Sequence, residues 1–260
     1  MSGHIGSSEN LHWNTPEDIK EPVWGFFNGP PDLDPASNST SIMGAEVNYV
    51  LPHNDGLSDP WAIKGEGTKV WLNPPFGRSY MKPDRSDVIG AKQFQSLREK
   101  DEIVAWLVKN GGVPPEASTV AGKKLAKSLK KFLQPDSEYF DPSFHKALYG
   151  DGNQLLQWKP ISSEYSVHTS IYDWTFRCQE MARLKDLSII CLLPAATDTA
   201  QWQEIVFKSA SKICFVQGRI AFLDSNGKPG GPCPMAMAMV YWGPAGDDFK
   251  RSFKDIGEVR

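Results

Sequence analysis

The sequence predicts one doubly wound α/β domain that carries a helical insertion, and three observations lead to this prediction. Apolar runs typical of buried strands alternate with helical patterns along the chain. The clearest run, residues 187–193, lies between helical patterns at residues 170–184 and 199–210, as expected for a central parallel strand. The stretch between residues 80 and 167 has helical periodicity and no convincing strand.

The N-terminal part of the chain predicts a flexible tail followed by a helix. Residues 1–12 are polar and rich in glycine and serine, which is typical of a tail without fixed structure. Thr15, Pro16 and the two acids that follow predict a helix over residues 16–27. In this prediction Thr15 is the N-cap and Pro16 occupies the first helical position.

Short apolar runs predict further strands on both sides of the insertion. Residues 32–36 predict a strand that leaves into a turn, because the residue before a proline is held in extended geometry. Residues 38–62 predict a loop, and residues 69–72 predict a buried strand. Residues 213–223 and 235–242 are separated by a turn-rich loop, which predicts an antiparallel hairpin.

The stretch 80–167 is expected to be an inserted helical subdomain, so that residues 13–79 and 168–260 form the main domain. Within the insertion, residues 122–133 predict a helix with an apolar face and a lysine-rich face. The lysines are Lys123, Lys124, Lys127, Lys130 and Lys131. This face would suit phosphate groups, and a solvated helix face is an equally good interpretation.

The composition limits what the protein can bind. The net charge of -3 excludes a globally basic protein, so a nucleic-acid partner would need a locally basic surface. The four cysteines form no C-x-x-C pair and lie mostly in apolar runs, which predicts buried free thiols in a reducing cytosol. The five histidines show no metal-ligand spacing, so we expect no zinc site and no other metal.

The sequence shows no pattern for export or for membrane insertion. The first residues lack the apolar core of a signal peptide, and no run of about 18 apolar residues occurs. We therefore expect an intracellular, cytoplasmic protein without a membrane partner.

The segment Asn73-Pro74-Pro75-Phe76 directly follows the predicted strand 69–72. It places a carboxamide oxygen and a proline carbonyl side by side at a strand end, and an aromatic ring follows them. Two acceptors can take the two N–H groups of a planar exocyclic amine, and the ring can stack on the base that carries it. The motif therefore predicts a methyl-acceptor site. A rigid Pro-Pro turn that ends a strand is the simpler alternative.

Together with other segments, this motif resembles the phage-type DNA N6-adenine methyltransferases. The order and the content of the segments match that family, and the stretch 80–167 is the part that does not. The matching segments are Trp13-Asn14-Thr15-Pro16, Leu33-Asp34-Pro35-Ala36-Ser37, Asp55-Gly56-Leu57 with Trp61, Val70 to Gly77, Leu192 to Thr199 with Trp202, and Gly218-Arg219-Ile220-Ala221-Phe222.

The resemblance implies a Rossmann-like class I methyltransferase domain that uses S-adenosylmethionine to methylate adenine N6 in double-stranded DNA. It also points to a phage or prophage origin. If the lysine-rich face of residues 122–133 binds DNA, the 80–167 insertion is the natural target-recognition element. The cofactor would lie at the carboxyl ends of the strands. The implied cofactor-binding residues are Trp13, Thr15 and Pro16 at the methionine end, Asp34, Pro35 and Ala36 in the first strand-to-helix turn, and Asp55 at the nucleoside half. No Gly-x-Gly follows Asp34, which departs from the wider methyltransferase pattern.

The adenine amino group is a poor nucleophile, because its lone pair is delocalised into the ring. If the Asn73 oxygen and the Pro74 carbonyl each accept one N–H, they localise that pair and stabilise the charge that develops during transfer. Phe76 would stack on the flipped base. Phe222 is a candidate second wall of the base pocket, or a core residue of a hairpin strand. Arg219 would meet a phosphate, or is a surface cation.

Other functions remain open at this point. The same motif resembles sites in methyltransferases for cytosine N4, RNA guanine N2 and protein glutamine, where the acceptor is also a planar nitrogen. A nucleic-acid-binding protein that has lost activity on the same scaffold is a further alternative. The sequence leaves the oligomeric state and the recognised DNA sequence open.

Overall fold

The structure is a computed structural model that describes residues 13–51, 53–64, 67–109, 164–183 and 187–260. The chain divides into two compact units, Met1–Ser79 together with His168–Arg260, and Tyr80–Val167. The sequence analysis separates the main domain from the insertion at the same residues. The predicted tail at residues 1–12 and the predicted lysine-rich helix at residues 122–133 lie outside the described residues.

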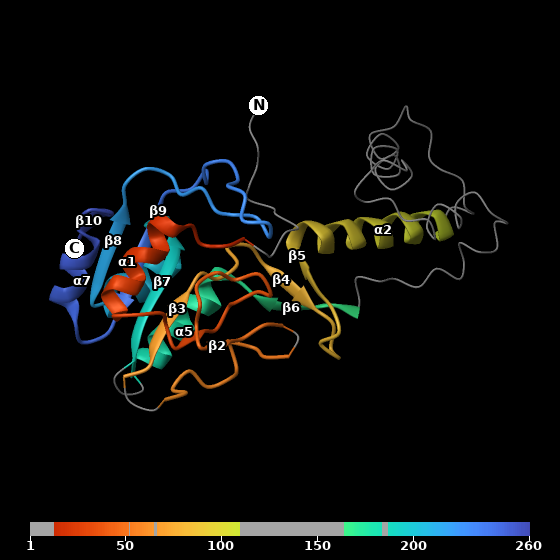
Figure 1. The fold of residues 1–260 in the computed structure, drawn as a ribbon. Helices are drawn as coiled ribbons and strands as arrows, with labels where there is room; N and C mark the ends of the chain where they lie inside the picture. The colour runs from red at the N-terminus through yellow and green to blue at the C-terminus, as the bar shows by residue number, and fades with distance from the viewer. Residues whose placement is uncertain (1–12, 52, 65–66, 110–163, 184–186) are drawn as a thin grey trace. The chain divides into compact units, whose positions relative to one another are not determined.

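A seven-stranded, mostly parallel sheet forms the centre of the first unit (Figure 1). Its order is β10-β8-β9-β7-β3-β1-β2. The strands are β1 (Leu33–Asp34), β2 (Val47–Asn48), β3 (Lys69–Leu72), β7 (Ser188–Pro194), β8 (Lys212–Val216), β9 (Met237–Trp242) and β10 (Gly257–Val259). Neighbouring pairs from β2 to β7 are parallel. Strand β9 is antiparallel to both β7 and β8, so β8 runs in the same direction as β7. The molecule is thus a mixed α/β protein, as the sequence predicts.

The direction of the chain through the sheet changes between β1 and β3. After β1 the chain moves outward to β2, and it then returns to form β3 on the other side of β1. Ligands of open α/β sheets bind outside the carboxyl ends of the strands at such a topological switch point. Asp34 is the last residue of β1 and Asn73 follows the last residue of β3. The fold therefore brings two predicted site segments to the edge where such sheets bind ligands.

Hydrophobic clusters cover both faces of the sheet. The helices are α1 (Glu17–Phe27) and α7 (Gly246–Phe253) on one face, and α5 (Ile171–Arg183) and the π-helix η4 (Gln201–Val206), continued by α6 (Phe207–Ser209), on the other. In β3, Trp71 packs on the side of α1, and Val70 and Leu72 pack on the side of α5, as the two-residue period of a strand requires. Burial on both faces explains the almost continuous apolar run of β7.

The second unit contains strands, so the expectation of a stretch without convincing strands is wrong. A three-stranded sheet has the order β5-β4-β6. It consists of β4 (Ser79–Met81), β5 (Val88–Gly90) and β6 (Ser166–Thr169), and α2 (Ala91–Lys109) follows β5. Each strand has only three or four residues, which is too short for an alternating pattern to be recognised. The partners β4 and β6 also come from opposite ends of the insertion.

Three further expectations need correction. Thr15 is not a helix N-cap, because α1 begins at Glu17 with an extended Pro16 as N-cap and no side-chain cap bond. The predicted loop at residues 38–62 contains the two-residue strand β2. The hairpin is confirmed by the antiparallel pairing of β8 and β9, but its first arm ends at Val216. Gly218 follows with a φ of 81°, a left-handed conformation that does not continue a strand.

Two expectations about residue types can also be compared with the structure. Cys178, Cys191, Cys214 and Cys233 are free and buried, as predicted. Among the described residues, no helix is both long enough and apolar enough to cross a membrane.

Candidate functional site

The predicted acceptor motif lies in the loop that directly follows β3. Asn73 and Phe76 are half-buried and Pro74 is buried. The Asn73 Nδ2 donates a hydrogen bond to Thr15 Oγ1 at 3.4 Å. Within the described residues, neither Asn73 Oδ1 nor the Pro74 carbonyl accepts a hydrogen bond. Two acceptors from adjacent residues are therefore uncommitted at the carboxyl end of β3.

Phe222 lies against Phe76, although the two residues are far apart in the sequence. Their ring centroids are 6.0 Å apart and their planes meet at 63°, an edge-to-face arrangement. Phe222 lies in an irregular segment after β8, so it is not on a hairpin strand. It is nevertheless buried in the hydrophobic cluster on the α1 side of the sheet. The loop that carries the two uncommitted acceptors thus also contributes one ring of an aromatic pair.

The loop that carries Phe222 is closed by its own hydrogen bonds. The Asp224 carboxylate accepts from the backbone N–H of Asn226 at 2.8 Å and of Lys228 at 2.9 Å. The Gly230 N–H donates to the Phe222 carbonyl at 2.8 Å. Such aspartate-capped turns hold a short loop in one conformation. The sequence analysis identified this segment as a turn-rich loop but did not connect it with the site.

The segment Trp13-Asn14-Thr15 is held against this loop. Asn14 and Leu223 exchange two backbone hydrogen bonds, at 2.8 and 3.0 Å. Trp13 packs on Gly230 so closely that a Cβ there would come within 2.9 Å of the indole ring. The structure therefore brings Trp13 and Thr15, which the sequence analysis assigned to a cofactor, beside the acceptor motif.

The segment Asp34-Pro35-Ala36 forms the turn after β1, as expected. Asp34 is buried, and its Oδ1 accepts from the Ala36 N–H at 3.2 Å. Gly56 packs directly on this turn, since a Cβ on Gly56 would lie 1.9 Å from the Pro35 carbonyl oxygen. The Asp55-Gly56 segment is therefore adjacent to the turn, and two predicted cofactor segments meet at the end of β1.

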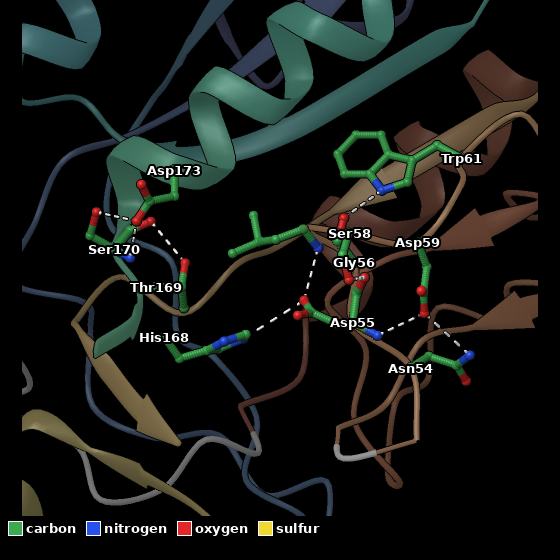
Figure 2. A network of polar contacts seen from close by, with 11 residues as sticks. Asn54, Asp55, Gly56, Ser58, Asp59, Trp61, His168, Thr169, Ser170 and Asp173 are labelled. Atoms are coloured by element: carbon green, nitrogen blue, oxygen red, sulfur yellow. Dashed lines mark hydrogen bonds and ion pairs between the residues drawn. The ribbon is translucent and has the colours of Figure 1, made fainter. Parts of the chain in front are cut away.

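Asp55 is held in place by several groups of the first unit (Figure 2). Its Oδ1 accepts from the Leu57 N–H at 3.0 Å and lies 3.7 Å from His168 Nε2. The two side chains are 12% and 6% exposed, respectively. The carboxylate of Asp59 accepts from the Asp55 N–H at 2.9 Å. No local sequence pattern indicates His168, because it lies far along the chain from the loop that carries Asp55.

The Asp34 carboxyl titrates abnormally. Burial raises its pKa from 3.8 to about 7, although hydrogen bonds from Ala36 and Ser37 favour the ionised form. Between these two pKa values the folded protein holds a proton that the unfolded chain lacks. The free energy of unfolding should therefore fall as the pH rises from about 4 to about 7.

Replacing Asp34 by asparagine should remove this pH dependence, because an amide keeps the acceptor for Ala36 and cannot ionise. Between about pH 4.5 and 6.5, the wild-type free energy of unfolding should fall more steeply than that of the variant, by up to about 1.4 kcal/mol per pH unit. Urea unfolding at several pH values measures both slopes. Parallel slopes would show that the charge of Asp34 is not penalised in the folded protein.

The remaining predicted residues are less informative. Arg219 is exposed, which fits both a phosphate contact and a plain surface cation. Pro75 is half-buried and carries no polar hydrogen atom for binding. Lys123, Lys124, Lys127, Lys130 and Lys131 lie outside the described residues. In the part of the chain that the structure describes, no group of three or more metal-binding side chains comes together.

Comparisons with known proteins are negative: no family model and no curated protein matches the sequence, and no solved structure matches the fold. Fold class and site geometry therefore carry the functional argument.

Proposed function

We propose that this protein is an S-adenosylmethionine-dependent DNA methyltransferase that acts on the exocyclic N6 amine of adenine. One observation carries the proposal. Asn73 Oδ1 and the Pro74 carbonyl are uncommitted acceptors at the carboxyl end of β3, and Phe76 of the same loop pairs with the ring of Phe222. A base amine has two N–H donors and an attached aromatic ring, so this set of groups complements it.

The roles of the chain's own groups follow from the chemistry of the amine. Acceptance of both N–H groups by Asn73 and Pro74 favours a pyramidal nitrogen, whose lone pair then points away from the ring. The same two acceptors stabilise the positive charge that develops on the nitrogen in the transition state. A bound S-adenosylmethionine would supply a methyl group on a sulfonium: the new N–C bond would form as the C–S bond breaks, the sulfur would leave as a neutral thioether, and the nitrogen would lose a proton to solvent. Phe76 offsets part of the cost of unstacking the base.

The turn after β1 fits a cationic cofactor better than a phosphate-bearing one. Its backbone donors are committed, since the Ala36 N–H bonds to Asp34 and the Ser37 N–H bonds to the Tyr49 carbonyl. Pro35 has no N–H at all. Dinucleotide sites need free N–H groups at this turn to hold the pyrophosphate. In the described part of the chain no basic side chain pairs with the buried Asp34 carboxyl, so a cationic group bound beside it would lower its raised pKa and favour the ionised form.

The sheet order also supports the proposal. Strands β2, β1, β3, β7 and β8 run in one direction and β9 is antiparallel between β7 and β8, which is compatible with the Rossmann-like methyltransferase fold that the resemblance implies. Asp34, Pro35 and Ala36 at the end of β1, with Asp55 next to them, would then hold the cofactor. Asn73 at the end of the neighbouring β3 would face the acceptor base.

The decisive experiment is transfer of a tritiated methyl group from S-adenosylmethionine to duplex DNA, RNA and a protein lysate, followed by nucleoside analysis. We expect labelled N6-methyladenine from DNA. Label in N4-methylcytosine, in RNA or in protein would replace the proposed acceptor, although the aromatic pair favours a flat base over a glutamine side chain. Failure to bind the cofactor in isothermal titration would point to a binding protein without methyltransferase activity.

Replacing Phe76 by alanine should reduce methyl transfer, mainly by raising KM for DNA, because the flipped base loses its stacking partner. The expected loss of binding is about 1–3 kcal/mol, the usual contribution of one base–aromatic stack. The Phe76→Tyr variant keeps the ring and serves as the matched control. Steady-state kinetics on a duplex substrate distinguish the two variants, and equal losses in both would argue against stacking.

A further inference from the structure

We propose that Thr15 is a positioning residue whose hydroxyl orients the Asn73 carboxamide, so that Oδ1 faces the acceptor amine. This inference rests on the proposed function. The geometry behind it is the hydrogen bond from Asn73 Nδ2 to Thr15 Oγ1 at 3.4 Å. Besides the cofactor role that the resemblance implies for it, Thr15 has a side chain that contacts Asn73 of the acceptor motif.

The orientation of an asparagine side chain decides what it offers to a ligand. One end of the carboxamide accepts hydrogen bonds and the other end donates them, and a rotation of 180° exchanges the two. An amine that donates both N–H groups needs Oδ1 and would be repelled by Nδ2. In the productive orientation Nδ2 therefore needs an acceptor of its own. In the structure Thr15 Oγ1 is that acceptor, which leaves Oδ1 free for the amine, and loss of the hydroxyl would leave Nδ2 without a partner in this orientation.

Thr15 is well placed for this task because its backbone surroundings are fixed. Its side chain is almost completely buried, at 3% relative exposure for the residue. The preceding residue, Asn14, exchanges two backbone hydrogen bonds with Leu223, and its side chain bonds to Asn38 and Thr40. The following Pro16 has a restricted φ and leads directly into α1. A buried hydroxyl on a segment held at both ends can fix the orientation of its partner.

The arrangement also aligns the two halves of the acceptor site. Leu223 follows Phe222, so the backbone pair with Asn14 ties the segment of Thr15 to the loop that carries the second aromatic ring. Thr15 then reaches Asn73, three residues before Phe76. The amine acceptor and the aromatic pair are thus positioned through one continuous set of contacts.

The test compares Thr15→Val, which keeps the shape but removes the hydroxyl, with Thr15→Ser, which keeps the hydroxyl. We expect kcat for methyl transfer to fall about tenfold in the valine variant, the factor that corresponds to one ordinary hydrogen bond. The serine variant should retain kcat within about twofold of the wild type. The Kd for S-adenosylmethionine, measured by isothermal titration, should change little in both variants. Thr15→Ala, which adds no bulk, takes the place of valine if that variant does not fold.

The same substitution of Thr15 in an Asn73→Asp variant gives a second test of the inference. An Asp side chain at position 73 presents an oxygen in either orientation, so it does not need Thr15 to select one. In the Asn73→Asp background, Thr15→Val should therefore change kcat by no more than about twofold, giving a clear non-additivity in the double-mutant cycle.

The outcomes separate the inference from the proposed function. An inactive wild-type protein would contradict the proposed function and leave no methyl transfer to be positioned, so the inference would fall with it. An active wild type with an unchanged kcat in Thr15→Val would overturn the inference alone. A weakened cofactor Kd with kcat retained would also overturn it, because Thr15 would then serve the cofactor instead of Asn73.

Discussion

Replacing Asn73 by alanine should reduce kcat for methyl transfer by roughly 100- to 1000-fold, the usual cost of removing one preorganised transition-state hydrogen bond. The physical reason is that Asn73 Oδ1 accepts no hydrogen bond within the described residues and is free to accept one from the amine. Under the proposed function, its loss would leave one N–H of the amine unpaired, so the nitrogen lone pair would stay delocalised. Methyl transfer to duplex DNA under saturating cofactor measures the effect.

Two controls make this result specific to catalysis. The affinity for S-adenosylmethionine should be retained, because Asp34 and Asp55, at the end of β1, are unchanged. The melting temperature should change by only a few degrees, since Asn73 is half-buried and makes a single long hydrogen bond. The Asn73→Asp variant keeps an oxygen acceptor and should be far more active than Asn73→Ala. An alanine variant with wild-type kcat would exclude Asn73 from the chemistry.

Replacing Gly56 by alanine should cause the largest loss of stability. A Cβ at this position would lie 1.9 Å from the Pro35 carbonyl oxygen and 2.8 Å from the Pro35 carbonyl carbon. Both atoms belong to the backbone of the turn after β1, so they cannot move away as a flexible side chain would. We expect the free energy of unfolding to fall by about 3 kcal/mol or more, at the upper end of ordinary overpacking effects. Urea unfolding measures this change.

Two other glycines provide matched controls for added volume. Gly231 has no heavy atom within 4 Å of an added Cβ, so Gly231→Ala should change stability by less than about 0.5 kcal/mol. Gly25 lies inside α1 and also has free space, and alanine is a better helix former there. Gly25→Ala should therefore stabilise the protein by about 0.5–1 kcal/mol. A Gly56→Ala variant as stable as these two would show that the Pro35 turn can yield.

Gly56→Ala should also weaken the binding of the proposed cofactor. Asp55 precedes Gly56, and the Gly56 carbonyl accepts from Trp61 Nε1 at 2.8 Å. Displacement of this segment would move the Asp55 carboxylate away from Leu57 and His168, which hold it in the arrangement of Figure 2. Under the proposed function, a Gly56→Ala variant that is folded at low temperature would therefore bind S-adenosylmethionine more weakly than the wild type.

Much of the main fold was predictable because its signals are local. The run at residues 187–193 and the Lys69–Leu72 segment became β7 and β3, since strands covered on both faces consist almost entirely of apolar residues. The helical patterns at residues 170–184 and 199–210 became α5 and η4 with α6. The second of these has π-type hydrogen bonding, which apolar periodicity does not distinguish from an ordinary helix.

Short elements with distant partners were not predictable in the same way. Strand β2 has two residues and pairs with β1, and β4 pairs with β6 from the far end of the second unit. A strand of two or three residues carries no measurable alternation, so its existence depends on the partner that supplies its hydrogen bonds. The same reason explains why residues 213–223 stop being a strand at Val216: the pairing with β9 ends at Phe215, and Val216 has its partner, Gly257, in β10.

The candidate site likewise has some features that local sequence predicts and others that depend on tertiary packing. Two positions follow from properties of neighbouring residues. A hydrophobic run places Asn73 and Pro74 at the end of a buried strand, and proline geometry places Asp34 before a turn. Packing of distant segments placed Thr15 against Asn73, Phe222 against Phe76, and His168 beside Asp55. No local pattern encodes these contacts, because each depends on how the strands are ordered in the sheet and on which loops meet at its carboxyl edge.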